Sequence, residues 1–162
     1  MNELKLEVND LSAFEAKLRE LGGQMGEPCW NGNWYLETTA DRVLKIVQAL
    51  DKYCLQELQK LDTGFAFVGE TPVDDIAFYQ LEKIPEHNVL HKTVRSWQIG
   101  EQCVDALAFD DIGTYVCVNY EDGERGKALD FIYKDLQLAN PAFIEVPFNV
   151  LKRRRLGLTD FD

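Results

Sequence analysis

Charged and apolar residues alternate at the start of the chain. Glu3, Lys5 and Glu7 are separated by Leu4 and Leu6. Because successive side chains of a β-strand point to opposite faces, the three charged groups would share one face and the leucines the other. Such a charged face is either solvated or the wall of a cavity that binds an ionic ligand. The choice between these two alternatives decides whether the protein could be an enzyme.

Two histidines and four cysteines are further residues whose types could hold a metal. His87 and His91 have the i, i+4 spacing that places two ligands on one helix face, but Pro85 and the apolar residues 89–90 favour a loop leading into a strand. The cysteines include no Cys-x-x-Cys pair, and no two lie within ten residues of each other: Cys29, Cys54, Cys103 and Cys117. We therefore predict reduced, partly buried thiols and no structural zinc site.

Several nucleotide and hydrolase motifs are missing from the sequence. It has neither the Gly-x-x-x-x-Gly-Lys-Ser/Thr loop of P-loop proteins nor a Gly-x-Ser-x-Gly elbow, which excludes both of those site types. Trp30, Trp34 and Trp97 could stack on a ligand in a cleft. Isolated aromatic residues near strands are more typical of a core or a barrel rim.

The composition is that of an acidic globular protein. The 162 residues carry a net charge of −11, which disfavours nucleic acid and anionic membranes and leaves a basic protein partner open. No apolar run approaches the roughly 20 residues that span a bilayer, and the N-terminus does not resemble a signal peptide, so we expect a cytoplasmic protein. The one strong basic run is expected in a solvated tail or the last turn of a helix: Lys152, Arg153, Arg154 and Arg155.

Hydrophobic periodicity predicts one α+β domain over residues 1–162. Residues 3–8 have the pattern of a strand, 24–32 that of a loop, and residues 11–21, 126–138 and 148–155 that of helices. Strand-like segments recur at short, regular intervals: 34–38, 43–47, 53–58, 65–68, 76–81, 89–97, 101–109 and 114–120. This spacing predicts a largely antiparallel sheet or barrel of about eight strands, with helices at its ends.

Five local patterns carry a family resemblance: Leu21-Gly22-Gly23, Asn33-Trp34-Tyr35-Leu36, Val43-Leu44-Lys45-Ile46, His91-Lys92-Thr93-Val94-Arg95 and Asp111-Ile112-Gly113-Thr114-Tyr115. In this order, and with the helices between them, they resemble the CYTH superfamily, also called the triphosphate tunnel metalloenzymes. That family includes class IV adenylyl cyclases and several triphosphatases. The resemblance implies a closed eight-stranded barrel whose bore is filled with charged side chains.

The same resemblance implies a set of site residues. In the family, inward basic residues bind a triphosphate, and acids of an E-x-E-x-K motif on the first strand help to hold Mg²⁺ or Mn²⁺. Carried over by position, Lys5, Lys45 and Lys92 become anion-binding residues. The implied metal ligands are Glu3, Glu7 and Glu82.

This chain departs from the family pattern at many of those positions. In Glu3-x-Lys5-x-Glu7 the second acid and the base have exchanged places. Non-ionic residues stand where the family has arginines or acids: Val47, Phe78, Gln80, Val94, Cys117 and Asn119. Arg95 is basic but has the opposite facing parity. We expect Phe78 and Cys117 to make part of the bore apolar.

These departures lead to three functional hypotheses. The first is a CYTH-like protein that binds a phosphorylated or other anionic small molecule in its tunnel without the family's catalysis. The second is a phosphohydrolase that acts on triphosphates with rearranged ligands and uses Mg²⁺ or Mn²⁺. The third is an acidic protein–protein interaction module. An unrelated α+β fold with an open sheet remains the structural alternative.

Overall fold

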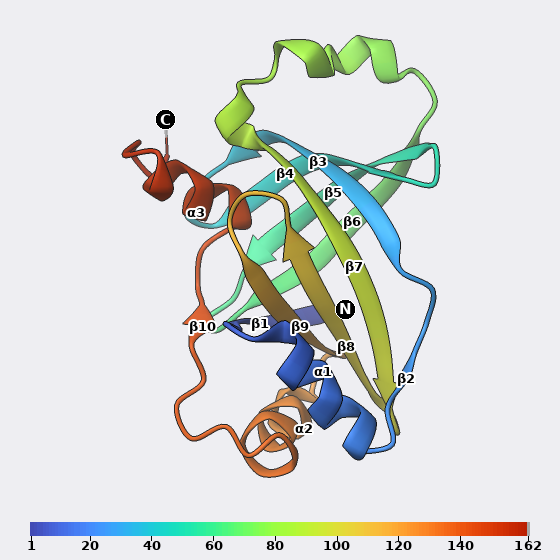
Figure 1. The fold of residues 1–162 in the computed structure, drawn as a ribbon. Coiled ribbons are helices and arrows are strands. Elements are labelled where there is room, and N and C mark those ends of the chain that lie inside the picture. The colour runs from blue at the N-terminus through green and yellow to red at the C-terminus, as the bar shows by residue number, and fades with distance from the viewer. Residues whose placement is uncertain (162) are drawn as a thin grey trace.

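Strand β1 (Asn2–Glu7) pairs with both β6 and β9 and so closes a barrel. The computed structural model describes residues 1–161. The barrel order is β1-β6-β5-β4-β3-β7-β8-β9, antiparallel throughout (Figure 1). The other barrel strands are β3 (Cys29–Thr38), β4 (Arg42–Ala49), β5 (Lys52–Lys60), β6 (Phe65–Val73), β7 (Val89–Ile99), β8 (Gln102–Phe109) and β9 (Thr114–Tyr120). The predicted eight-stranded antiparallel barrel is thus confirmed.

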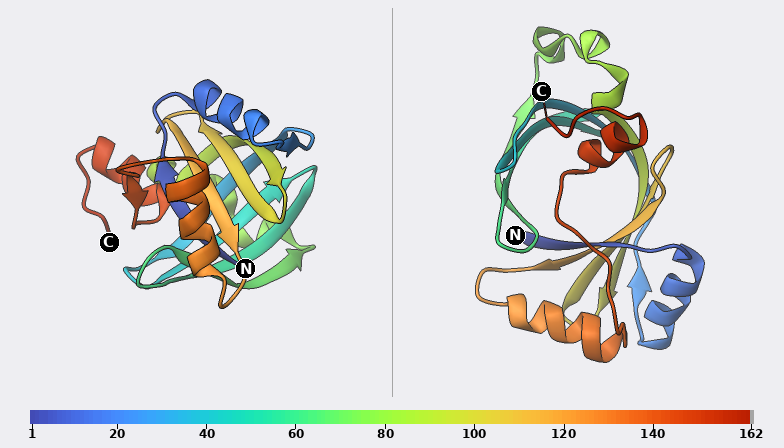
Figure 2. Two further views of the ribbon diagram at one scale, coloured as in Figure 1. Left: turned by 90° about the horizontal axis from the view of Figure 1, so that it is seen from below. Right: turned by 90° about the vertical axis from the view of Figure 1, so that its left-hand side faces the viewer.

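Short helices and two minor strands surround the barrel. They are α1 (Leu11–Glu20), β2 (Gln24–Met25), the 3-10 turns η1 (Ile76–Tyr79), η2 (Leu81–Lys83) and η3 (Glu86–Asn88), α2 (Arg125–Asp130), the π-helical η4 (Phe131–Asp135), β10 (Phe143–Ile144) and α3 (Phe148–Arg155). Figure 2 shows α1 and α2 outside the barrel and α3 across one of its openings. Among residues 1–161, no helix has the length and hydrophobicity that crossing a membrane requires.

The alternation of the first strand separates two apolar clusters. Leu4 and Leu6 are fully buried in an outer cluster with residues of α1 and α2, such as Leu18 and Ala128. Glu3 and Lys5 point the other way and line the bore. The second cluster includes Phe148, the first residue of α3, and several residues that line the bore, such as Tyr35 and Phe65. The charged face of β1 is therefore the wall of a cavity, one of the two alternatives that its sequence left open.

Helix α1 is attached to the barrel through the buried carboxylate of Glu15. Asp10 caps the helix by accepting a hydrogen bond from the backbone N–H of Ala13 at 3.0 Å. Glu15 accepts hydrogen bonds from the Arg95 guanidinium and, at 2.8 Å, from Trp97 Nε1. Arg95 thus faces outward, as its strand parity predicted, and Trp97 is a core residue.

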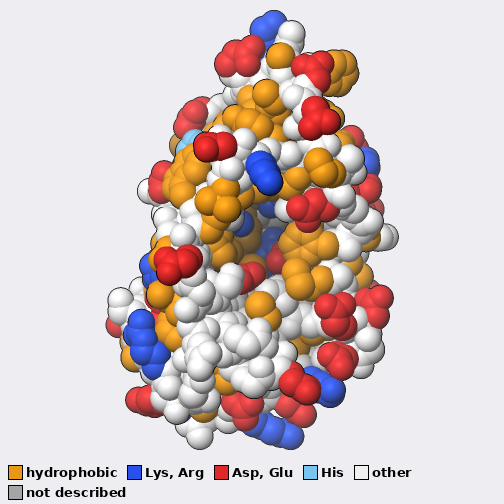
Figure 3. All heavy atoms as spheres, turned by 90° about the vertical axis from the view of Figure 1, so that its right-hand side faces the viewer, with side chains coloured by type: hydrophobic (Ala, Val, Ile, Leu, Met, Phe, Trp, Pro, Cys, Tyr) orange, Lys and Arg blue, Asp and Glu red, His pale blue; other side chains and the backbone are white. Residues whose placement is uncertain are grey.

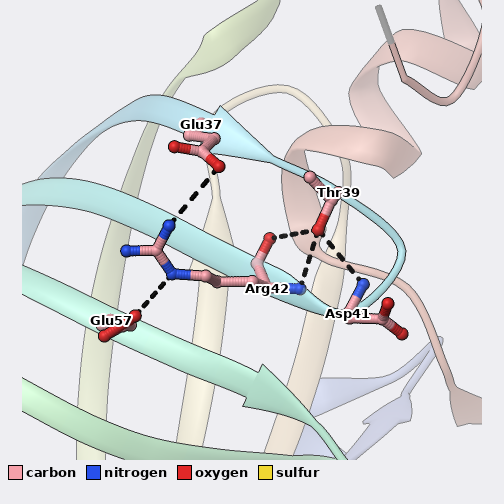
Figure 4. A network of polar contacts seen from close by, with 5 residues as sticks. All are labelled: Glu37, Thr39, Asp41, Arg42 and Glu57. Atoms are coloured by element: carbon pink, nitrogen blue, oxygen red, sulfur yellow. Dashed lines mark hydrogen bonds and ion pairs between the residues drawn. The ribbon is translucent and has the colours of Figure 1, made fainter.

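The β3–β4 hairpin is held by its turn and by an ion-pair network on the outer surface (Figure 4). Thr39 Oγ1 accepts hydrogen bonds from the backbone N–H groups of Asp41 and Arg42, at 3.3 and 3.1 Å. The Arg42 guanidinium then bridges Glu37 on β3 and Glu57 on β5. The network lies at the surface, so its main effect is on the geometry of the hairpin.

The segment 76–81 is not the strand that its apolar pattern predicted. It forms 3-10 turns, and the Phe78 side chain is 76% exposed, so Phe78 does not enter the bore. Residues 69–73, which lie between two of the predicted strand segments, instead belong to β6, whose pairing with β5 continues to Val73. The register shifts between the pairs Glu57–Gly69 and Leu58–Phe67, which makes Val68 the extra residue of a β-bulge.

Two further elements begin and end at other residues than the sequence predicted. The expected loop 24–32 contains β2 and the start of β3. The predicted helix 126–138 is α2 followed by one π-helical stretch, in which the Leu136 N–H donates to Phe131 O at 2.9 Å. In this π-helical stretch Phe131 is buried, whereas Tyr133 is half exposed. The terminal helix 148–155 is confirmed as α3.

Candidate functional site

The bore of the barrel contains a cavity of about 170 Å³ that brings four of the predicted site residues together. Glu3 and Lys5 come from β1, Lys45 from β4 and Lys92 from β7. Residues two positions away on the same strands also line the cavity, such as Val47 next to Lys45 and Val94 next to Lys92, as expected for one inward face. Figure 3 shows a hollow in the molecular surface, with blue basic and red acidic side chains in its depth.

The Lys5 ammonium contacts groups from β6 and from the segment that leads into α3. Its Nζ donates to the Val146 carbonyl at 3.4 Å and lies 3.7 Å from the Phe65 ring centroid and 4.3 Å from that of Phe148. Pro147 and Phe148 line the cavity, so the segment leading into α3 forms one of its walls. An ammonium over aromatic faces keeps part of the stabilisation that it loses on leaving water.

Aromatic rings lie close to the ammonium groups of Lys45 and Lys92. Lys45 Nζ lies 5.3 Å from the Tyr35 ring centroid, and Lys92 Nζ lies 5.4 Å from that of Phe109. Within residues 1–161, none of the three bore lysines forms an ion pair with a carboxylate. The bore therefore presents three ammonium groups without a carboxylate in direct contact.

Burial weakens the proton affinity of two of these lysines. Desolvation, with the nearby Lys92 charge second, lowers the pKa of Lys45 to about 7. Desolvation also lowers the pKa of Lys5 to about 8, although the Glu3 carboxylate partly opposes the shift. An anion in the bore would reverse these shifts because an opposite charge favours the protonated lysine.

Two carboxylates line the same cavity, Glu3 and Asp105. Asp105 has partners, because Ser96 Oγ donates to its Oδ1 at 2.6 Å and Asn119 Nδ2 donates to its Oδ2 at 3.0 Å. Glu3 is 8% exposed and has no hydrogen bond or ion pair in the part of the chain that the structure describes. Of the two acids, Glu3 is the one whose carboxylate accepts no hydrogen bond from the described residues.

The three carboxylates predicted as metal ligands are not gathered in one place. Glu7 is exposed at the end of β1, and Glu82 is exposed on η2, outside the barrel strands. Neither lines the cavity with Glu3. No cluster of three or more His, Cys, Asp or Glu side chains suited to a metal ion occurs in residues 1–161. The side chains of the bore therefore do not fit a resident Mg²⁺ or Mn²⁺ ion held by protein ligands alone.

The cysteines and histidines considered in the sequence lie partly in the bore and partly outside it. All four cysteines are free thiols. Cys117 lines the cavity as expected, and burial raises the pKa of its thiol well above the usual value. His87 lies on η3, whereas the His91 ring stacks on Trp30 with centroids 5.1 Å apart, so the two do not share a helix face.

The basic run lies in the last turns of α3 and secures that helix. Lys152 Nζ forms an ion pair with Asp111 at 2.8 Å and donates to the Val89 carbonyl at 2.8 Å. The Arg155 guanidinium donates to the Ile112 carbonyl at 2.8 Å. These contacts hold the helix against the barrel opening.

The sequence reasoning missed Asn33 and Asp105. Both belong to strand patterns of period two: Asn31-x-Asn33-x-Tyr35 on β3 and Cys103-x-Asp105-x-Leu107 on β8. A polar residue inside such an alternation, flanked two positions away by residues of the inward face, was the available signal. It went unused because Asn33 was considered only as part of the aromatic strand pattern, and Asp105 matches no motif.

Neither a protein-family model nor a curated protein matches this sequence. Solved structures do match. A conserved hypothetical protein from Pyrococcus furiosus has a TM-score of 0.77 at 18% identity, covering 93% of this chain and 98% of that chain. A putative adenylate cyclase from Vibrio parahaemolyticus has a TM-score of 0.65 at 14% identity, covering 92% and 95%.

A third match is a putative adenylyl cyclase from Hippeastrum, which is described as having a dominant triphosphatase activity. Its TM-score is 0.63 at 14% identity, and the match covers 98% of this chain and 97% of that chain. The closed eight-stranded barrel and these likenesses define the class of fold. It is the CYTH-like fold that the sequence pattern resembled. Identities this low establish the fold alone, so the function of this chain is argued from its own bore.

Proposed function

We propose that this protein binds a small phosphorylated anion in the barrel bore and does not catalyse triphosphate hydrolysis there. The observation that carries the proposal is the trio of lysines that line one cavity without a carboxylate partner: Lys5, Lys45 and Lys92. Placing a charged group in a protein interior costs several kcal/mol unless an opposite charge compensates it. A phosphate group supplies that charge and accepts several charge-assisted hydrogen bonds.

The size of the cavity favours a small ligand. Its volume is about 170 Å³, whereas pockets for drug-sized molecules typically measure about 300–1,000 Å³. Tyr35, Phe65 and Phe148 occupy space in the bore and narrow it. A phosphate ester or a short polyphosphate suits this volume better than a nucleotide.

The rest of the lining argues for binding without turnover. Hydrolysis in a metal-dependent site needs carboxylates that hold the ion and activate water. Of the two bore carboxylates, Asp105 is already hydrogen bonded. Val47, Val94 and Cys117 stand where the family pattern has ionic groups and add apolar wall.

One observation favours a metal-dependent phosphohydrolase as the second candidate. The Glu3 carboxylate has no protein partner and lies in the same cavity as the lysines. Because Mg²⁺ is often bound by one or two carboxylates together with substrate phosphates, a ligand could bring such an ion with it. The acidic interaction module remains a prediction from the net charge alone.

A calorimetric titration of tripolyphosphate into wild-type protein and two lysine variants tests the proposal. Lys92→Met removes an ammonium from the cavity, and we expect the affinity to fall about 10- to 100-fold, since hydrogen bonds to charged groups contribute about 1.5–3 kcal/mol. Lys52→Met removes an exposed lysine at the start of β5 and serves as the matched control. Equal losses in the two variants would mean that the anion binds outside the bore.

A further inference from the structure

We propose that the bore recognises a phosphate ester that also carries a protonated amine, with Glu3 and Asn33 binding the amine. This inference rests on the proposed function because the same lysines bind the phosphate. It names a class of ligand, small zwitterionic phosphate monoesters, that differs from a bare polyphosphate in having a hydrogen-bond donor.

Glu3 supplies the first observation. Its side chain is buried, lines the cavity and has no partner among the described residues. It shares the inward face of β1 with Lys5, two residues on, so the cavity wall presents an anion beside a cation. A polyphosphate would use the lysines but would meet like charge at Glu3, which is destabilising. A tethered ammonium converts that repulsion into a charge-assisted hydrogen bond.

Asn33 supplies the second observation. It is 1% exposed and lines the same cavity, and neither Oδ1 nor Nδ2 has a hydrogen-bond partner in the described structure. Its neighbours across the strands are Val47 on β4 and Leu90 on β7, whose side chains cannot satisfy an amide. An unsatisfied buried polar group is destabilising, so a ligand that supplies the missing hydrogen bonds gains affinity. The amide offers an acceptor for an ammonium and a donor for a phosphate oxygen.

The cavity therefore offers both hydrogen-bond donors and acceptors. The number of acceptors bears on whether an amine or a metal ion binds there. The free acceptors include the Glu3 carboxylate and Asn33 Oδ1, and the donors include the lysines and Asn33 Nδ2. A divalent cation needs about six oxygen ligands, and no three-acid cluster is present in residues 1–161. An ammonium needs only about three acceptors, which two side chains and a water can provide.

The test compares two phosphate esters that differ at one end. In O-phosphoethanolamine an ammonium takes the place of the terminal methyl group of n-propyl phosphate, and the phosphate is the same. Calorimetric titration should give at least about tenfold tighter binding of O-phosphoethanolamine, because one charge-assisted hydrogen bond contributes about 1.5–3 kcal/mol.

Glu3→Gln makes the comparison sharper. It should weaken binding of O-phosphoethanolamine and strengthen binding of n-propyl phosphate, since it removes a negative charge from the cavity. Glu7→Gln, on the same strand but outside the cavity, is the control and should change neither affinity. Asn33→Ala should reduce the ratio of the two affinities, and the melting temperature of each variant reports whether it has folded.

Each remaining outcome has a distinct meaning. Equal affinities for the two esters in the wild-type protein would overturn the amine inference and leave phosphate binding intact. Tripolyphosphate binding that requires Mn²⁺ and disappears in Glu3→Gln would also overturn it, because Glu3 would then be a metal ligand. If none of the three phosphates binds, the proposed function itself fails.

Discussion

The ammonium of Lys5, on the first strand, lies 4.3 Å from the ring centroid of Phe148, in the last helix. The contact joins the two ends of the described chain inside the barrel. Phe148 also packs against the Phe109 and Tyr115 rings at 4.8 and 5.1 Å. The last helix is thus a structural wall of the cavity, and its first residue sets the surroundings of a candidate ligand-binding lysine.

Removing that wall should destabilise the protein. Phe148→Ala is expected to lower the free energy of unfolding by about 3–5 kcal/mol, as for other buried phenylalanines, which chemical denaturation would measure. Phe78→Ala is the matched control because Phe78 is exposed on η1, and its cost should stay within about 0.5 kcal/mol. Similar values for both variants would show that α3 does not pack into the barrel end as described.

Lys45 should oppose folding stability while it supports binding. Lys45→Met replaces a buried ammonium that lacks a carboxylate partner by an apolar side chain of similar length, which we expect to raise the free energy of unfolding by about 1–4 kcal/mol at pH 6. The same variant should lose affinity for tripolyphosphate. Denaturant titration and calorimetry measure the two effects, with Lys52→Met as the exposed control. A destabilised Lys45→Met protein would indicate that Lys45 has a structural partner.

Anion binding should weaken as the pH rises from 7 to 9. The pKa values of Lys45 and Lys5 are lowered to about 7 and about 8, mainly by burial, so both lose their charge in this range. Sulfate is a suitable probe because its own charge does not change there. We expect proton uptake on sulfate binding at pH 8, seen as a dependence of the binding heat on the ionisation enthalpy of the buffer. Affinity that stays constant from pH 7 to 9 would contradict the assignment of these lysines.

The same shifts have a consequence for stability. The pKa values are lower in the folded state than in the unfolded chain, so the unfolded chain binds more protons between about pH 7 and 10.5. These two lysines therefore make stability rise with pH across that window. Other groups titrate there too, so the measurement is the difference between wild type and Lys45→Met, which should shrink as the pH increases.

The buried Glu15 should stabilise the junction of α1 and the barrel. Burial alone would raise the pKa of Glu15, but hydrogen bonds from Arg95 and Trp97 outweigh it, and the pKa is lowered below 4.5. Its contribution is present above pH 4.5 and is lost as the pH falls through the folded-state pKa. Glu15→Ala should cost about 3–5 kcal/mol because it leaves Arg95 without its partner.

The control for this variant is Glu20→Ala on the same helix. Glu20 is exposed and lies 3.9 Å from Lys17, a surface pair expected to contribute at most about 1 kcal/mol. Denaturant unfolding at pH 7 and pH 3 would show the Glu15 effect at the higher pH and a smaller one at the lower. A Glu15 effect that does not change with pH would attribute it to packing instead of charge.

The sequence predicted the parts of the fold that depend on local periodicity. Alternation on β1 placed Leu4 and Lys5 on opposite faces, which the structure confirms, but it did not decide which face lines the cavity. The prediction failed at 76–81, where an apolar run resembles a strand but flanking prolines and Asp74-Asp75 favour turns. Periodicity also could not reveal the π turn, because its effect on which side chains are buried depends on tertiary packing.

The family resemblance placed the basic residues of the site more accurately than the acidic ones. Lys45 and Lys92 were placed in the bore by their position in well-matched strands. Glu82 was misplaced because the segment that contains it does not form a barrel strand. Glu7 was misplaced because it is the exposed last residue of β1 and lies outside the cavity. Asn33 could not be identified as a site residue without the structure, since only the pairing of β3 with Val47 and Leu90 shows that its amide lacks a partner.

The most direct test of the central claim is a calorimetric titration of tripolyphosphate with and without Mn²⁺, followed by an assay of the same sample for free phosphate. Binding in the bore through lysines predicts heat without metal and no phosphate release in either sample. Phosphate released only with Mn²⁺ would contradict the account and establish a metal-dependent hydrolase, whereas no heat in either titration would show that the lysines do not form an anion site.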